Sequence, residues 1–77
     1  MKEFNVLLSS INDVKVFVNT ACAQVFDIDI ASGRYIIDAK SIMGLFSIDL
    51  TKPVKVVVQG TDEEAAAFYA AVKQFAV

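Results

Sequence analysis

The chain has 77 residues, of which 56% are hydrophobic, and its formal net charge at neutral pH is −2. This length predicts one domain, spanning residues 1–77, and the apolar runs fall far below the roughly 20 residues that a membrane-spanning helix needs. The seven basic residues are scattered along the chain, which argues against a nucleic-acid surface because such surfaces cluster Lys and Arg opposite phosphates.

Residues 2–8, KEFNVLL, alternate apolar and polar side chains and predict a strand with Phe4, Val6 and Leu8 on one face. They show no long apolar stretch and no small-residue cleavage site, so no secretion signal is expected. A helix should follow, since Ser10 and Asp13 have the spacing of a capping box, with Asp in place of the usual Glu. Spacings of three and four then indicate a buried stripe of Ile11, Val14, Val18, Ala21 or Cys22, and Val25.

Cys22 is the only cysteine of the chain. It cannot form an internal disulfide, so a reducing cytoplasm is the expected location. We interpret it as a small core residue on the buried face of the first helix, because no cationic residue adjoins it in sequence to favour a reactive thiolate.

Residues 27–30, DIDI, alternate cleanly and predict a second strand with its aspartates facing solvent. The turn residues ASGR then lead into a third strand, RYIID. Asp27, Asp29 and Asp38 lack the spacing of a calcium or magnesium loop, so the sequence predicts no metal site.

Ser41 is a favoured helix N-cap and predicts a short helix, which TKP ends before the strand PVKVVV. Thr61 and Glu64 form a capping box that opens the last helix. The buried stripe of that helix is predicted to be Ala65, Phe68, Val72 and Phe75. The order βαββαβα indicates the α+β class: a two-layer, open-faced sandwich with a four-stranded antiparallel sheet covered on one face by three helices.

The short helix after Ser41 carries more apolar residues than one buried face requires. We expect Leu45 and Ile48 to point inward, which leaves Ile42, Met43 and Phe46 at least partly exposed. These three residues are either additional core or a protein-binding surface. The second interpretation is favoured, because exposed apolar clusters on small proteins mark contact sites and Met suits adaptable contacts.

The string KSIMGLFS, with NTA, the DIDI strand, the Gly-containing hairpin and the alanine-rich last helix, resembles the HPr family. This is the histidine-containing phosphocarrier family of the bacterial sugar phosphotransferase system. The family's phosphoacceptor histidine is followed by Ala, Arg and Pro, and the matching residues here are Ser10, Ile11, Asn12 and Asp13. The chain contains no histidine.

The resemblance therefore does not imply phosphocarrier activity. A serine phosphate ester is far less reactive than a phosphoimidazole, Asn12 cannot supply the cationic fork of an arginine, and Asp13 would repel a phosphate. We expect no enzymatic activity, no catalytic residue and no cofactor. A carrier that uses Ser10 or Cys22 is the least favoured alternative.

The family's second functional position, a regulatory serine phosphorylated by a dedicated kinase, matches Ser41. The resemblance implies that Lys40, Ile42, Met43 and Phe46 bind partners. The implied partners are that serine kinase, enzymes of the phosphotransferase system or a transcriptional regulator, with no nucleic acid and no membrane.

We therefore predict a regulatory, protein-binding module of the phosphotransferase system or of carbon metabolism. Two alternatives stay open: Ser41 as cap and switch, or Ser41 as cap only, in an interaction domain that keeps just the fold. A homodimer through the open sheet face or the apolar helix also stays open.

Overall fold

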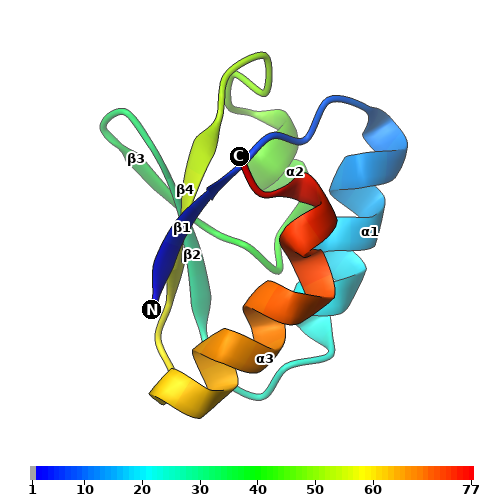
Figure 1. Ribbon diagram of the computed structural model, residues 1–77. Helices are drawn as coiled ribbons and strands as arrows, with labels where there is room; N and C mark the ends of the chain where they lie inside the picture. Colours follow the sequence, from blue (N-terminus) through cyan, green and yellow to red (C-terminus); the bar gives the residue numbers. More distant parts are fainter. Residues whose placement is uncertain (1) are drawn as a thin grey trace.

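The computed structural model describes residues 2–77, and Figure 1 shows a sheet with helices packed against one side. The strands are β1 (Glu3–Val6), β2 (Ile28–Ser32), β3 (Tyr35–Asp38) and β4 (Val54–Val58). The helices are α1 (Ile11–Cys22), α2 (Ile42–Phe46), α3 (Asp62–Val72) and a final 3-10 turn, η1 (Lys73–Phe75). Between residues 2 and 77, no helix is long and apolar enough to cross a bilayer.

The four strands form one sheet in the order β1-β4-β2-β3, and every neighbouring pair is antiparallel. One row of paired residues crosses the whole sheet: Phe4, Val56, Ile30 and Ile37. This row faces the helices, and its members on β4 and β2 are fully buried. Among residues 2–77, no helix lies over the opposite face of the sheet (Figure 1). The predicted fold class, an α+β open-faced sandwich, is therefore confirmed.

Aromatic rings join the helices to the sheet in the core. Phe17 of α1 and Phe68 of α3 are almost completely buried, and their ring centroids lie 5.7 Å apart in an edge-to-face arrangement. Phe4 of β1 meets Tyr69 of α3 edge to face with centroids 4.9 Å apart. Such pairs add about 0.5–1.5 kcal/mol each beyond the burial of their apolar area.

The predicted stripe of α1 is partly wrong. Its buried residues are Val14, Phe17, Val18 and Ala21. Phe17 was missed, although it lies three residues after Val14 and belongs to the same helical face. Val25 lies beyond the end of α1 and is 93% exposed, and Ile11, in the first turn, is 65% exposed.

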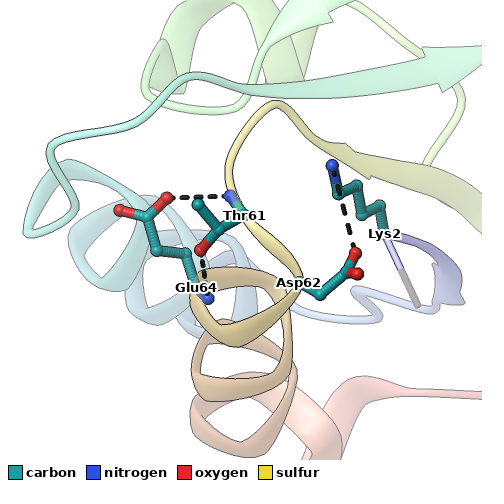
Figure 2. Close-up of polar contacts among 4 residues, drawn as sticks. All are labelled: Lys2, Thr61, Asp62 and Glu64. Carbon is teal, nitrogen blue, oxygen red and sulfur yellow. Dashed lines mark hydrogen bonds and ion pairs between the residues drawn. The ribbon is translucent and has the colours of Figure 1, made fainter.

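The start of α3 has the predicted capping box, which Figure 2 shows. The Glu64 N–H donates to Thr61 Oγ1 at 3.1 Å, and the Thr61 N–H donates to Glu64 Oε1 at 2.8 Å. Lys2 Nζ lies 4.0 Å from Asp62 Oδ1 beside this cap, and both side chains are solvent-exposed. An exposed ion pair of this kind contributes little, so the reciprocal cap fixes where α3 begins.

The last residues of the chain return to β1. The Leu7 N–H donates to the Phe75 carbonyl at 2.9 Å, and the Val77 N–H donates to the Asn5 carbonyl at 3.1 Å. Val6 and Ala76 form the bridge between these two bonds. Because Phe75 is also buried in the core, the C-terminal segment is held by both its backbone and a side chain.

Candidate functional site

Ser41 is the N-cap of α2. Its backbone is extended, with φ −102° and ψ 104°, and its Oγ accepts a hydrogen bond from the Gly44 N–H at 3.1 Å. The side chain thereby satisfies one of the amides that the first turn of a helix leaves without a partner. The cap is an observed contact, whereas phosphorylation of Ser41 remains a prediction.

The five-residue helix α2 presents its apolar residues in two directions. Leu45 is fully buried, and Ile42 and Ile48 are half-buried against the core. Met43 is 77% exposed and Phe46 is 43% exposed. Leu45 and Ile48 lie inward and Met43 and Phe46 outward, as expected, whereas Ile42, which was grouped with the outward residues, packs against the core. A role of the outward side in binding remains a prediction.

Gly44 allows α2 to lie close to β3. A Cβ atom at this position would stand 2.5 Å from Ile37 Cγ2 and 3.2 Å from Ser41 Oγ. The first distance is far below the 3.5–4.0 Å at which carbon atoms ordinarily pack. The glycine of the KSIMG string therefore has a packing role: it leaves room for both the Ile37 methyl group and the Ser41 cap.

Lys40 has structural partners that the sequence did not indicate. Its Nζ donates to the Gln24 carbonyl at 2.9 Å, and its N–H donates to Asp38 Oδ1 at 2.9 Å. The ammonium group thus links the end of α1 to the residue that precedes the Ser41 cap. Partner binding by Lys40 stays untested, but a change at this position would also disturb the join between the two helices.

The prediction that Cys22 is a core residue is wrong. Cys22 is exposed, and its Sγ lies 3.6 Å from the Lys40 carbonyl. Successive helical residues point about 100° apart, and it is Ala21, completely buried, that faces the core.

Side chains near the start of α1 form hydrogen bonds that cap the helix. Ser10 Oγ accepts from the Asp13 N–H at 3.0 Å, as the predicted capping box requires. The Asp13 carboxylate, however, accepts from Ser9 rather than from Ser10, from the N–H at 3.2 Å and the hydroxyl at 3.1 Å. A negative group therefore already lies at the positive end of the α1 dipole, where it opposes a second anion.

A hollow of about 350 Å³ separates the start of α1 from α2 and the loop that follows it. Its wall includes Ser10, Ile11, Phe46 and Leu50. Ile11 was predicted to be core, yet at the first position of α1 it lies at this hollow and stays largely exposed. We name Ile11, Met43 and Phe46 the apolar surface: three exposed apolar residues from the two helices that flank the hollow.

Asp49 lies in the loop after α2, and its carboxyl group has a lowered pKa. Hydrogen bonds from the Thr51 hydroxyl and N–H, followed by the charge of Lys52, hold the pKa of Asp49 below its usual value, and desolvation opposes them only in part. Within residues 2–77, no group of three or more His, Cys, Asp or Glu is placed to hold a metal ion.

Solved structures of HPr proteins resemble this fold. HPr-C-His from Thermoanaerobacter tengcongensis shares 28% identity over 96% of this chain and 89% of its own, with a TM-score of 0.75. HPr from Bacillus anthracis str. Ames shares 30% identity over 91% and 94% of the two chains, with a TM-score of 0.66. The catabolite repression protein Crh from Bacillus subtilis shares 27% identity over 90% and 84%, with a TM-score of 0.64.

A search of curated protein sequences found no match. The family model described as "PTS HPr component phosphorylation site" matches residues 13–76, from the first turn of α1 to the residue after η1. The match covers most of the chain and agrees with the strand order, the helix positions and the structural neighbours. The chain therefore belongs to the HPr family of the phosphotransferase system.

Proposed function

We propose that this HPr-family protein is a regulatory module of the phosphotransferase system or of carbon metabolism, which binds other proteins in the cytoplasm and does not carry phosphoryl groups. The observation that supports binding is the apolar surface, where Met43 is 77% exposed, Ile11 65% and Phe46 43%. Ile11 and Phe46 line the hollow, and Met43 lies three residues before Phe46 on the same helix. Exposed apolar clusters are typical of contact sites. The proposed partners are the serine kinase of this system, its phosphotransferase enzymes or a transcriptional regulator.

The start of α1 argues against a carrier role. The chain has no histidine, and the hydroxyl of Ser10 is occupied as a helix cap. A phosphate on Ser10 would break that cap and lie close to the Asp13 carboxylate, whose charge repels it. With phosphoenolpyruvate and the first enzyme of the system, we expect no transfer of label to Ser10 or Cys22, and transfer to either would overturn this part of the proposal.

Ser41 is the proposed point of regulation. A phosphate there would lie at the start of α2 and add a charge of about −1.5 to −2 beside the apolar surface. An apolar or acidic partner would then bind more weakly, and a partner with a basic pocket would bind more tightly. The modification would thus change the choice of partner.

The test of this regulation is intact-mass measurement after incubation with the family's serine kinase and ATP. We expect the mass of one phosphoryl group to be added to the native protein and to Ser47→Ala, and none to be added to Ser41→Ala. Ser47 is a matched control because it is an exposed serine at the other end of α2. No mass increase in the native protein, or an increase that survives Ser41→Ala, would contradict the regulation.

The binding surface is tested separately with Met43→Asp, and Ile36→Asp serves as the control. Both residues are more than two-thirds exposed, at 77% and 73%, but Ile36 lies on β3, outside the apolar surface. We expect Met43→Asp to abolish binding to the serine kinase while the free energy of unfolding changes by about 0.5 kcal/mol or less. If Met43→Asp unfolds the protein, or if Ile36→Asp weakens binding as much, the surface is not the binding site.

A second candidate is an interaction domain without phosphorylation. The Ser41 hydroxyl already has a structural partner in the Gly44 N–H, which is the observation that favours this candidate. Binding that depends on Met43 in a protein that the kinase does not modify would select it.

Self-association is a separate proposal for such a module. The structure of Crh is described as a swapped, intertwined dimer. We propose that a homodimer of this protein would use either the open sheet face or the apolar surface. Light scattering on Met43→Asp and on Ile36→Asp would separate the two, since each change places a charge on one of these surfaces.

A further inference from the structure

Three of the seven basic residues of this acidic chain line one groove. The groove has a volume of about 620 Å³ and is separate from the apolar surface. It lies where the β2–β3 hairpin and the loop before β4 meet at one end of the open sheet face, and both segments project at that end in Figure 1. The three cations are Arg34 from the hairpin, Lys52 from the loop and Lys55 from β4.

These cations are incompletely neutralised. Asp49 is the only acid that the described part of the chain contributes to the groove wall, and Lys55 Nζ pairs with Glu3 Oε1 from the adjacent strand at 3.3 Å. Among residues 2–77 the ion pairs involve Lys2 and Lys55, which leaves Arg34 and Lys52 without one. With three positive and two negative groups counted, the groove keeps an excess of one positive charge while the whole chain is at −2.

The arrangement of the groove fits a phosphate better than a single carboxylate. Arg34 offers a planar fork of donors, and two lysines from other segments offer point charges, so donors can approach several oxygens of one phosphate. Tyr35, Ile48 and Pro53 add an apolar wall for the carbon skeleton of a ligand. The volume lies within the range of about 300–1,000 Å³ that small-molecule sites occupy.

We propose that this groove binds a small phosphate monoester, with Arg34 and Lys52 as the main phosphate contacts. Lys55 is the third contact, and its ion pair with Glu3 reduces its contribution to binding. The site takes a phosphorylated small molecule rather than a polynucleotide, because a single excess positive charge does not match a chain of phosphates. It uses neither Ser41 nor the apolar surface, so the failure of one proposal leaves the other standing.

The test is a titration of the isotope-labelled protein with phenyl phosphate at constant ionic strength, followed by the amide resonances of residues 31–35 and 47–52. Phenol, benzoate and inorganic phosphate are titrated in parallel to separate the contributions of the ring, the single charge and the phosphate. We expect saturable shifts at those amides with millimolar affinity for phenyl phosphate. Inorganic phosphate should bind more weakly at the same amides, benzoate more weakly still, and phenol should not saturate.

Two double variants of equal charge decide whether the binding is local. Arg34→Gln with Lys52→Gln should lower the affinity for phenyl phosphate roughly tenfold, since two charge-assisted contacts are removed. Lys15→Gln with Lys73→Gln changes two exposed lysines outside the groove and should leave the affinity within about twofold. Equal weakening by the two pairs would mean a diffuse ion atmosphere only and would overturn the proposal, as would the absence of saturable shifts in the native protein.

A gain in affinity supplies an independent check. Glu3→Gln removes the ion pair of Lys55 and should raise the affinity for phenyl phosphate about two- to fivefold, the equivalent of one exposed ion pair. Glu63→Gln removes the same charge from the exposed first turn of α3 and should have a much smaller effect. If both changes tighten binding equally, Lys55 is not a contact and the groove as proposed is wrong.

Discussion

Replacement of Gly44 by Ala should destabilise this protein, although the same change inside a helix is ordinarily stabilising. Ala is favoured over Gly in a helix by about 1 kcal/mol. Here the new methyl group would stand 2.5 Å from Ile37 Cγ2 and 3.2 Å from Ser41 Oγ. Ile37 cannot simply rotate away, because β-branched side chains are stiff at χ1.

The expected size follows from the two opposing terms. Overpacking of this kind costs about 1–3 kcal/mol, against a gain of about 1 kcal/mol from helix propensity. We therefore expect Gly44→Ala to lower the free energy of unfolding by about 1 kcal/mol. In an Ile37→Ala background the clashing methyl group is gone, so the second change should become neutral or stabilising, with a coupling energy of about 1–3 kcal/mol.

Urea unfolding of the native protein, the two single variants and the double variant measures this coupling. Ile37→Val is the matched control, because valine keeps Cγ2, so Gly44→Ala should remain destabilising in that background. If Gly44→Ala stabilises the native protein, or costs the same in all three backgrounds, the close approach of α2 to β3 is not what requires the glycine.

Three further predictions concern stability. Ser41→Ala should lower the free energy of unfolding in urea by about 1 kcal/mol, the contribution of an N-cap. A decrease smaller than about 0.2 kcal/mol would contradict the observed cap. The lowered pKa of Asp49 stabilises the fold above the unfolded-state pKa, and this contribution is lost as pH falls through the folded-state pKa. Asp49→Asn should therefore be less stable than the native protein at neutral pH and equally stable in acid; a difference that grows in acid would refute this. Phe17→Ala should cost about 3–5 kcal/mol by thermal or urea unfolding, whereas Cys22→Ala should cost about 0.5 kcal/mol or less; comparable losses would place Cys22 back in the core.

The strands and helices follow from the sequence where one rule acts alone. The alternation in DIDI predicted β2, and the Thr61–Glu64 spacing predicted the reciprocal cap of α3. Both signals are local: neither depends on what packs against the segment. The sheet order β1-β4-β2-β3 was not predicted, because residue patterns do not state which strands pair.

The errors in α1 arose where the exposed face depends on tertiary neighbours. Spacings of three and four indicate a helical face but not its limits: Val25 lies beyond the end of α1, Ile11 lies in the exposed first turn, and Phe17 of the same face was left out. Only the position of α1 over the sheet shows which turns are covered. The sequence also did not predict the contacts of Lys40 with Gln24 and of Asp13 with Ser9. An ammonium or carboxylate group can form hydrogen bonds with several partners, and the backbone conformation nearby determines which one lies within reach.

The sequence did not predict the groove between the hairpin and the loop before β4. Its cations are separated along the chain by up to 21 positions, from Arg34 to Lys55, and looked scattered. The fold brings them together because β2, β3 and β4 are neighbours in the sheet. A judgement that basic residues are dispersed therefore holds for the sequence and not for the surface.

The return of the chain end to β1 also has a consequence for how this protein avoids aggregation. The edge of a sheet exposes unpaired N–H and C=O groups that can pair with the edge strand of another molecule. Here the segment from Phe75 to Val77 occupies the outer edge of β1 through two backbone bonds. The side chain of Phe75 anchors that segment in the core. The chain end thus pairs with part of the β1 edge, at Asn5 and Leu7, whereas within residues 2–77 no strand pairs with the outer edge of β3.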